Sequence, residues 1–149
     1  MMLRYQEIGE VHKDFHRTMV KTLIYLRDKY GEDFLRAVAR RMAHDVYRSI
    51  YEDLKRGETE QLQEFWEYFL HREGGSYTIS MSYERVDLEL NVQSCPVLAY
   101  LRKIGIPKKD IHVICDFTRM LNEALIEDTP FKAFLEFGEN GCCQTICRR

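Results

Sequence analysis

The first 75 residues carry apolar side chains at helical spacing in three successive stretches, 8–30, 34–54 and 62–70. A glycine follows each stretch, as helix C-termini favour. We therefore predict three amphipathic helices that bury one stripe each. The predicted stripes are Val11, Phe15, Met19, Leu23, Leu26 and Tyr30, then Phe34, Val38, Met42, Val46, Ile50 and Leu54, then Leu62, Phe65, Trp66, Phe69 and Leu70.

The pattern then changes to strict alternation, which is typical of half-buried strands. Apolar and polar residues alternate over 77–83 and again over 86–92, with opposite phase. A two-residue connection at Glu84-Arg85 explains the change of phase and places the apolar residues on one face. Glu-Arg is poor chemistry for a tight turn, so a wider turn is the alternative. The predicted pairs are Tyr83 with Val86, Met81 with Leu88 and Ile79 with Leu90.

Two more helices and a second hairpin complete the pattern. Pro96 suits the first position of a helix that ends near Gly105, because the missing N–H would be unpaired there anyway. A further helix is predicted over 111–125, and alternation over 131–137 predicts a strand. Asn140-Gly141 is a strong turn signal, either as a two-residue turn or within a four-residue loop. Residues 142–147 then form the return strand.

These elements predict an α+β fold in a single domain, 1–149. N-terminal helices pack on a roughly four-stranded antiparallel sheet, and two further helices lie between the hairpins. Residues 1–75 would form a helical support, and residues 76–149 would carry the strands and all five cysteines.

Composition and charge narrow the function classes. The net charge of −2, with basic and acidic residues interspersed, argues against nucleic-acid binding. It likewise argues against a helix-turn-helix over 101–124, and the basic stretch 36–48 is better explained as a solvated helix face. No run reaches the roughly 18 apolar residues of a membrane span. The first ten residues lack the pattern of a signal peptide, so we expect a cytoplasmic protein without a membrane partner.

The five cysteines are odd in number, and none forms a Cys-x-x-Cys pair. A disulfide framework is therefore a poor explanation, and we expect free thiols in a reducing compartment. Cys95 precedes Pro96 and would occupy the N-cap of a helix. Free N–H groups and the positive end of the helix dipole would favour its thiolate there. A small residue tolerated at a strand-to-helix junction is the alternative explanation.

Two further cysteines point to the same region. With either form of the Asn140-Gly141 connection, Cys142 shares a strand face with Leu135, Phe137, Gln144 and Ile146, and Cys143 lies on the other face. If Leu135 and Phe137 face the core, Cys142 faces inward. Cys115 lies one position off the apolar stripe of its helix, beside Asp116, a carboxylate that could act as a general base.

Metal binding is the competing hypothesis for these thiols. Cys95, Cys115 and Cys142 could together bind zinc, but structural zinc sites usually show closely spaced ligand pairs, whereas these residues are 20 or more positions apart. His12 and His16 have the i, i+4 spacing of metal ligands, but we expect no acidic partner to complete a ligand set with them. We therefore expect no cofactor, and a metal at Cys95, Cys115 and Cys142 is the open alternative.

The order Cys95-Pro96, Cys115-Asp116 and Gly138-Glu139-Asn140-Gly141-Cys142 resembles the L-2-amino-thiazoline-4-carboxylic acid hydrolase-like family. The strand pair before Cys-Pro, the two following helices and the terminal hairpin are similar as well. The resemblance implies a hydrolase that opens a cyclic thiazoline amino acid towards N-carbamoyl-cysteine. It also implies a fold near the vinyl-reductase-type and nitric-oxide-sensor-type ligand-binding domains. Cys95, Cys115 and Cys142 would form the site, with Asp116 beside it. This chain continues with Cys143 and Gln144, which leaves open whether Cys142 or Cys143 is the matching thiol.

Two hypotheses follow. In the first, Cys95 is the nucleophile of a hydrolase acting on a small cyclic C–N or C–S substrate, Asp116 is a base, and Cys115 and Cys142 line the pocket. In the second, the same fold binds or senses a small ligand or a metal without turnover. A basic group at the site would favour the first hypothesis, and His112 is the nearest histidine in the sequence. The oligomeric state is not predicted.

Overall fold

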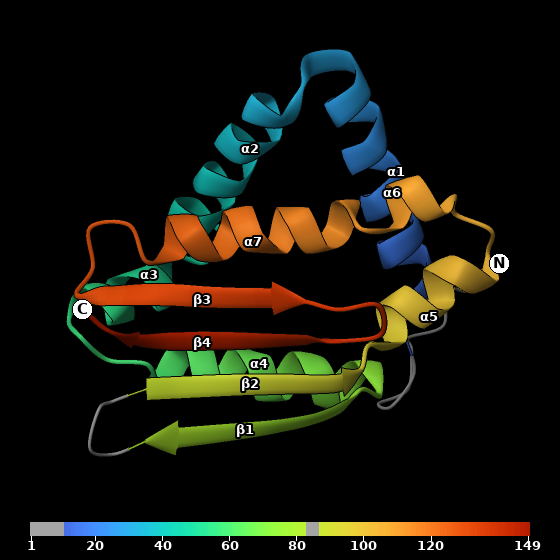
Figure 1. Ribbon diagram of the computed structural model, residues 1–149. Helices are drawn as coiled ribbons and strands as arrows, with labels where there is room; N and C mark the ends of the chain where they lie inside the picture. The colour runs from blue at the N-terminus through green and yellow to red at the C-terminus, as the bar shows by residue number, and fades with distance from the viewer. Residues whose placement is uncertain (1–10, 83–86) are drawn as a thin grey trace, which may run out of the picture.

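The computed structural model describes residues 11–82 and 87–149. The predicted Glu84-Arg85 turn, with the pair Tyr83 and Val86, lies outside the described residues. The elements, labelled in Figure 1, are α1 (Lys13–Tyr30), α2 (Glu32–Asp45), α3 (Arg48–Lys55), α4 (Glu60–Glu73), β1 (Ser76–Ser82), β2 (Asp87–Ser94), α5 (Pro96–Lys103), α6 (Lys108–Ile111), α7 (Val113–Leu125), β3 (Phe131–Phe137) and β4 (Cys142–Arg148).

The strands form a four-stranded antiparallel sheet in the order β1-β2-β4-β3. Ile79 pairs with Leu90 and Met81 pairs with Leu88, which confirms the register predicted from the alternation. The two hairpins meet through β2 and β4, where Val92 lies opposite Cys142. The predicted α+β class, with N-terminal helices and an antiparallel sheet, is confirmed.

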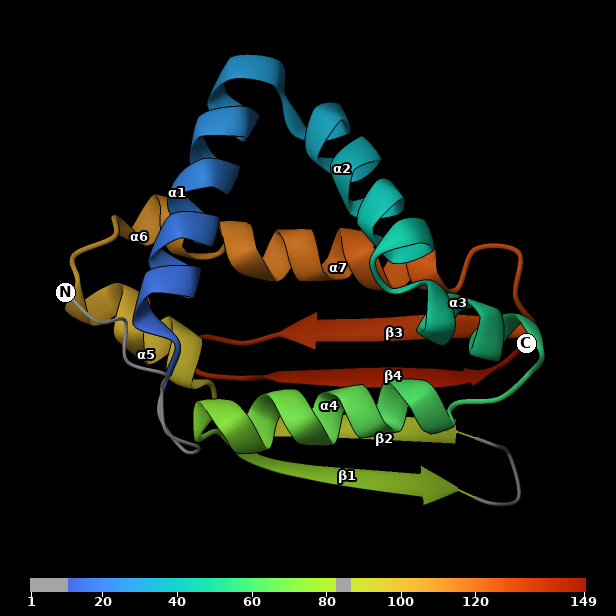
Figure 2. The same ribbon diagram turned by 180° about the vertical axis from the view of Figure 1, so that it is seen from behind.

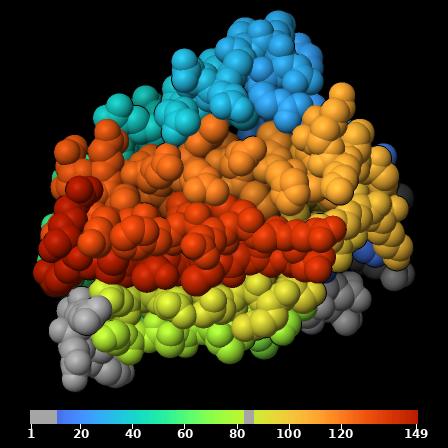
Figure 3. Space-filling view, in the orientation of Figure 1, coloured from blue at the N-terminus to red at the C-terminus, as the bar shows by residue number. Residues whose placement is uncertain are grey.

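Helices cover one face of the sheet. Figure 2 shows α4 lying along that face, with α1 and α2 forming an inverted V above it. α7 runs along the β3 edge, and Arg119 of α7 donates a 3.1 Å hydrogen bond from Nη1 to the carbonyl oxygen of Leu135. The opposite face of the sheet has no helix over it in Figure 1, and Figure 3 shows it as part of the surface. The core and any enclosed cavity therefore lie between α4, α7 and the inner face.

The predicted single helix over 34–54 is wrong, because α2 ends at Asp45 and α3 begins at Arg48. The N–H of Tyr47 donates to the carbonyl oxygen of Met42, a bond spanning five residues instead of four. This wider turn rotates the following helix, so Val46 is exposed and Tyr47 packs against the core. Likewise the predicted helix over 111–125 begins at Val113, after the separate short α6.

The buried face of α2 lies one position away from the predicted stripe, and that of α1 does so at His16 and Val20 but includes the predicted Leu23. α1 buries His16, Val20 and Leu23, while Phe15 and Tyr30 are more than half exposed. α2 buries small side chains, Ala39 and Ala43, together with Leu35. Small residues let α2 approach α7 closely, while the bulkier Val38 and Met42 are half-buried beside them and Phe34 and Val46 are exposed.

The buried residues form two clusters. One lies between α4 and the sheet, and the other lies between α1, α2, α5 and α7. Cys95 and Leu121 pack against both clusters. Within the described ranges, no helix combines the length and the apolar character needed to cross a membrane.

Candidate ligand-binding site

A cavity of about 210 Å³ lies between α4, α7, α1 and the inner face of the sheet. Its wall is mostly aromatic and aliphatic, because the apolar faces of these elements converge there. Representative lining residues are Trp66 and Phe69 of α4, Phe117 and Leu121 of α7, and Leu90 and Val92 of β2. An apolar cavity with a few polar groups is the usual form of a small-molecule site.

Three of the predicted site residues line this cavity. Cys95 comes from the start of α5, Cys115 from α7 and Cys142 from β4. All three are free thiols and are partly buried. Cys142 faces the cavity beside Phe137, its partner across β3 and β4, as the strand parity predicts. Cys143 does not line the cavity.

Backbone contacts hold two of these thiols in place. The N–H of Cys95 donates a 2.8 Å hydrogen bond to the carbonyl oxygen of Asn140, and Arg102 Nη1 donates to Asn140 Oδ1 at 2.8 Å. Residues 138–141 form a four-residue connection, closed by Gly138 N–H donating to Gly141 O. A Cβ on Gly141 would lie 1.8 Å from Val92 O, so only glycine lets the hairpin approach β2 this closely.

The helix N-terminus does favour the Cys95 thiolate, as expected, but burial outweighs this effect. Burial raises the pKa of Cys95, although the N–H groups of Val97 and Leu98 act in the opposite direction. Burial also raises the pKa of Cys142, and it raises the pKa of Cys115 to about 12 with a further contribution from Cys95 and Cys142. The three thiols are therefore neutral at neutral pH, and thiolate chemistry is disfavoured.

The remaining predicted residues lie outside the cavity wall. Asp116 is exposed on α7 and does not line the cavity, although its charge contributes to the raised pKa of Cys115. His112 lies between α6 and α7 and does not line the cavity either. The basic group that the sequence places nearest to the thiols is therefore not the one that reaches the site.

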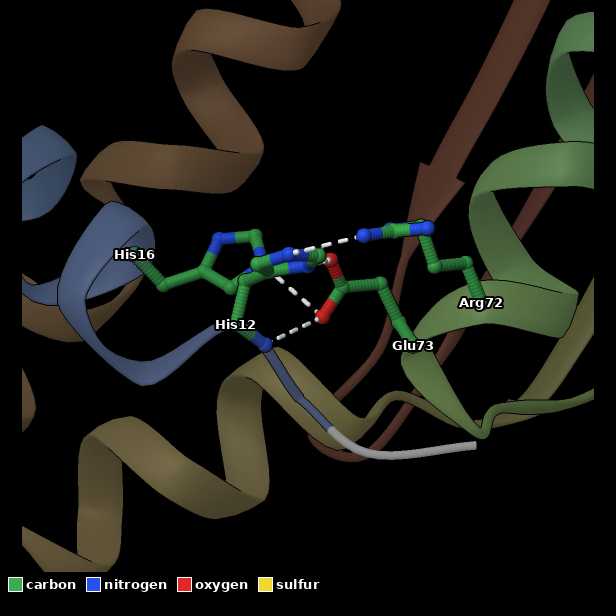
Figure 4. Close-up of polar contacts among 4 residues, drawn as sticks. All are labelled: His12, His16, Arg72 and Glu73. Atoms are coloured by element: carbon green, nitrogen blue, oxygen red, sulfur yellow. Dashed lines mark hydrogen bonds and ion pairs between the residues drawn. The ribbon is translucent and has the colours of Figure 1, made fainter. Parts of the chain in front are cut away.

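His16 is the histidine that does line the cavity. It is 3% exposed, and its Nε2 lies 3.1 Å from Oε2 of the equally buried Glu73 at the end of α4 (Figure 4). The backbone N–H of His12 donates to the same oxygen at 2.8 Å. Sequence spacing places His12 beside His16, but the acidic partner comes from a helix that only the fold brings near. The i, i+4, i+7 series His16, Val20 and Leu23 is the signal that would have identified the buried face.

A polar pair lies at the other side of the cavity wall. Asn122 Nδ2 donates to Gln144 Oε1 at 3.0 Å and to Thr118 O at 3.0 Å, and Gln144 Nε2 donates to Cys142 Sγ at 3.4 Å. Both amides are buried. They satisfy each other, as buried polar groups must.

The described side chains of His, Cys, Asp and Glu form no group of three that is arranged to hold a metal ion. Cys95, Cys115 and Cys142 thus share a cavity without the arrangement of a metal-ligand set, and metal binding by them stays a prediction.

Comparison of the chain with models of known protein families gives no match, and comparisons with curated proteins and with solved structures give none either. The family resemblance suggested by the three cysteine motifs therefore stays a prediction.

Proposed function

We propose that this protein binds a small, mostly apolar molecule in the cavity between the helices and the sheet. The proposal rests on the composition of the cavity wall, which is apolar apart from three neutral thiols and a few polar groups. A dry apolar cavity of about 150 Å³ is enough to bind benzene in another protein. A volume of about 210 Å³ therefore suits a compact molecule of one or two rings.

The state of the thiols supports binding over turnover. A nucleophilic cysteine acts as the thiolate, which here is disfavoured by burial at all three positions. A neutral buried thiol instead behaves as a small, polarisable apolar group that packs against a ligand. We also propose a cytoplasmic location, because the five cysteines are free.

Calorimetry with indole tests the binding proposal. We expect measurable binding to the purified protein, and loss of binding in Leu121→Trp, which fills the cavity from α7. The matched control is Phe134→Trp, at a half-exposed position on the outer face of the sheet. Equal binding by wild type and Leu121→Trp would place the ligand elsewhere and contradict the proposal.

A ring-opening hydrolase is the second candidate. It is favoured by the position of Cys95 at the N-terminus of α5, in a cavity that also contains the imidazole of His16. Incubation with 2-amino-thiazoline-4-carboxylate, followed by mass spectrometry for N-carbamoyl-cysteine, tests it. Turnover that is lost in Cys95→Ser and kept in Cys143→Ser would support the hydrolase. Absence of product with the wild-type protein would leave ligand binding as the function.

A further inference from the structure

His16 has unused hydrogen-bonding capacity in the cavity wall. Its two ring nitrogens are buried, and among the described residues neither has a hydrogen-bond partner. The contact from Nε2 to Glu73 Oε2 is short, at 3.1 Å, but lacks the angle of a hydrogen bond. Nδ1 lies on the side of the ring away from Glu73 (Figure 4). Leaving a buried polar atom unpaired is unfavourable, so a polar partner is expected at this position when the cavity is occupied.

The surroundings determine which nitrogen carries the proton. Arg72 Nη2 lies 3.4 Å from His12 Nε2, and an arginine can only donate, so His12 Nε2 accepts. His12 then carries its proton on Nδ1 and donates to Glu73 Oε1 at 3.0 Å. Glu73 is thereby held by the ring and the backbone N–H of His12, with Oε2 facing His16 as an acceptor. A proton on His16 Nε2 lies beside this carboxylate and is attracted to it even without hydrogen-bond geometry, so Nε2 bears the proton and Nδ1 keeps a free lone pair.

The ring is also fixed in orientation. His16 makes edge contacts with Phe15 at 5.1 Å and Phe69 at 6.1 Å between ring centroids. The other polar pair of the cavity wall, Asn122 and Gln144, is already hydrogen-bonded internally. Among the described residues, His16 is the one with buried side-chain polar atoms that lack a partner. His16 lines the cavity, so this unsatisfied acceptor lies within the wall that a ligand would contact, although Nδ1 itself has almost no accessible surface in the unliganded protein.

We propose that His16 Nδ1 is the polar recognition point of the cavity, and that the ligand is a compact apolar molecule carrying one O–H or N–H donor. Glu73 and His12 act as positioning residues that present the lone pair of His16. This inference rests on the proposed function and adds the chemical class of the ligand. Phenols, alcohols and ring N–H compounds belong to this class, and their O- or N-methylated analogues do not.

Matched probe pairs test the inference by calorimetry. Indole is compared with 1-methylindole, and phenol with anisole, because each pair differs in one donor. We expect the donor to bind at least about tenfold more tightly to the wild type, as loss of a hydrogen bond to a buried group predicts. The preference should vanish in His16→Phe and persist in His71→Phe, a control at an exposed histidine of α4.

A second measurement does not depend on the folding of a variant. Nitrogen-15 spectra of the histidine rings report the tautomer of His16 in the wild-type protein. We expect the Nε2–H tautomer, and a shift of Nδ1 on addition of indole but not of 1-methylindole. An Nδ1–H tautomer in the free protein would overturn the inference. Equal affinities within each probe pair would overturn it and leave ligand binding intact, whereas no binding of any probe would overturn both.

Discussion

The backbone N–H of Cys95 donates a 2.8 Å hydrogen bond to the carbonyl oxygen of Asn140. This bond joins the start of α5 to the β3–β4 connection, although the two residues lie 45 positions apart in the chain. It makes the Cys95-Pro96 and Asn140-Gly141-Cys142 segments one structural unit and places both thiols at the same cavity. Substitutions in the β3–β4 connection should therefore change the positions of the Cys95 and Cys142 thiols.

Gly141→Ala should destabilise the protein and displace Cys142. The new Cβ would lie 1.8 Å from Val92 O, a backbone atom, so β2 and the hairpin must separate. We expect a loss of about 1–3 kcal/mol in the free energy of unfolding, measured by urea denaturation. Gly138→Ala is the control, since its Cβ would meet Gly141 O at an ordinary 3.5 Å. Equal stability of the two variants would contradict the close approach at Gly141.

The cavity thiols should alkylate slowly. Because burial raises the pKa of Cys115 from 9.0 to about 12, its thiolate fraction at pH 8 falls by about 1,000-fold. Cys95 and Cys142 shift in the same direction. Iodoacetamide labelling, followed peptide by peptide with mass spectrometry, should show rates that still rise above pH 9. Guanidinium-unfolded protein serves as the reference, and rapid labelling of folded Cys95 at pH 7 would instead support a nucleophilic role.

Asn122 and Gln144 should be strongly coupled. Asn122→Leu leaves Gln144 Oε1 without its donor in a buried site, so we expect a loss of about 1–3 kcal/mol in the free energy of unfolding. The variant Asn122→Leu/Gln144→Leu removes both polar groups, and it should recover a large part of that loss. Urea denaturation of the four proteins in this cycle gives the coupling energy. Additive losses would mean that the two amides do not depend on each other.

The free energy of unfolding should decrease as the pH is lowered, and part of this decrease should depend on His16. Burial lowers the pKa of His16 below 6.5, while Glu73 acts in the opposite direction. The unfolded chain therefore takes up a proton on this side chain at a higher pH than the folded protein does. The free energy of unfolding attributable to His16 is constant above about pH 6.5 and declines as the pH falls towards the lower folded value.

Denaturation at several pH values between 5 and 8 tests this dependence. His16→Phe should show a shallower decline than the wild type, and His71→Phe should match the wild type. Glu73 and Arg72 from α4 and His12 from the start of α1 are the charged and titratable groups around the ring, and all three are present in both variants. A decline in His16→Phe as steep as in the wild type would assign it to another group.

Features of the site that depend on local backbone structure could be predicted from the sequence, whereas those that depend on burial could not. Strand parity correctly faces Cys142 towards the core, because alternation is a property of the strand backbone itself. The helix start at Pro96 is likewise local, and α5 begins there. The pKa of Cys95 was predicted in the wrong direction, because the local helix terminus is outweighed by burial under distant segments.

Local sequence patterns were enough to predict the strands and the register of the first hairpin, because backbone periodicity and turn chemistry act over a few residues. The full fold was needed to show which face of α1 is buried, where α2 ends, how β2 pairs with β4, and that Glu73 lies beside His16. These outcomes depend on which helix packs against which surface and on how much water that contact excludes. The spacing of residues along the chain does not contain this information. The His16–Glu73 contact therefore forms only when α1 and α4 pack together.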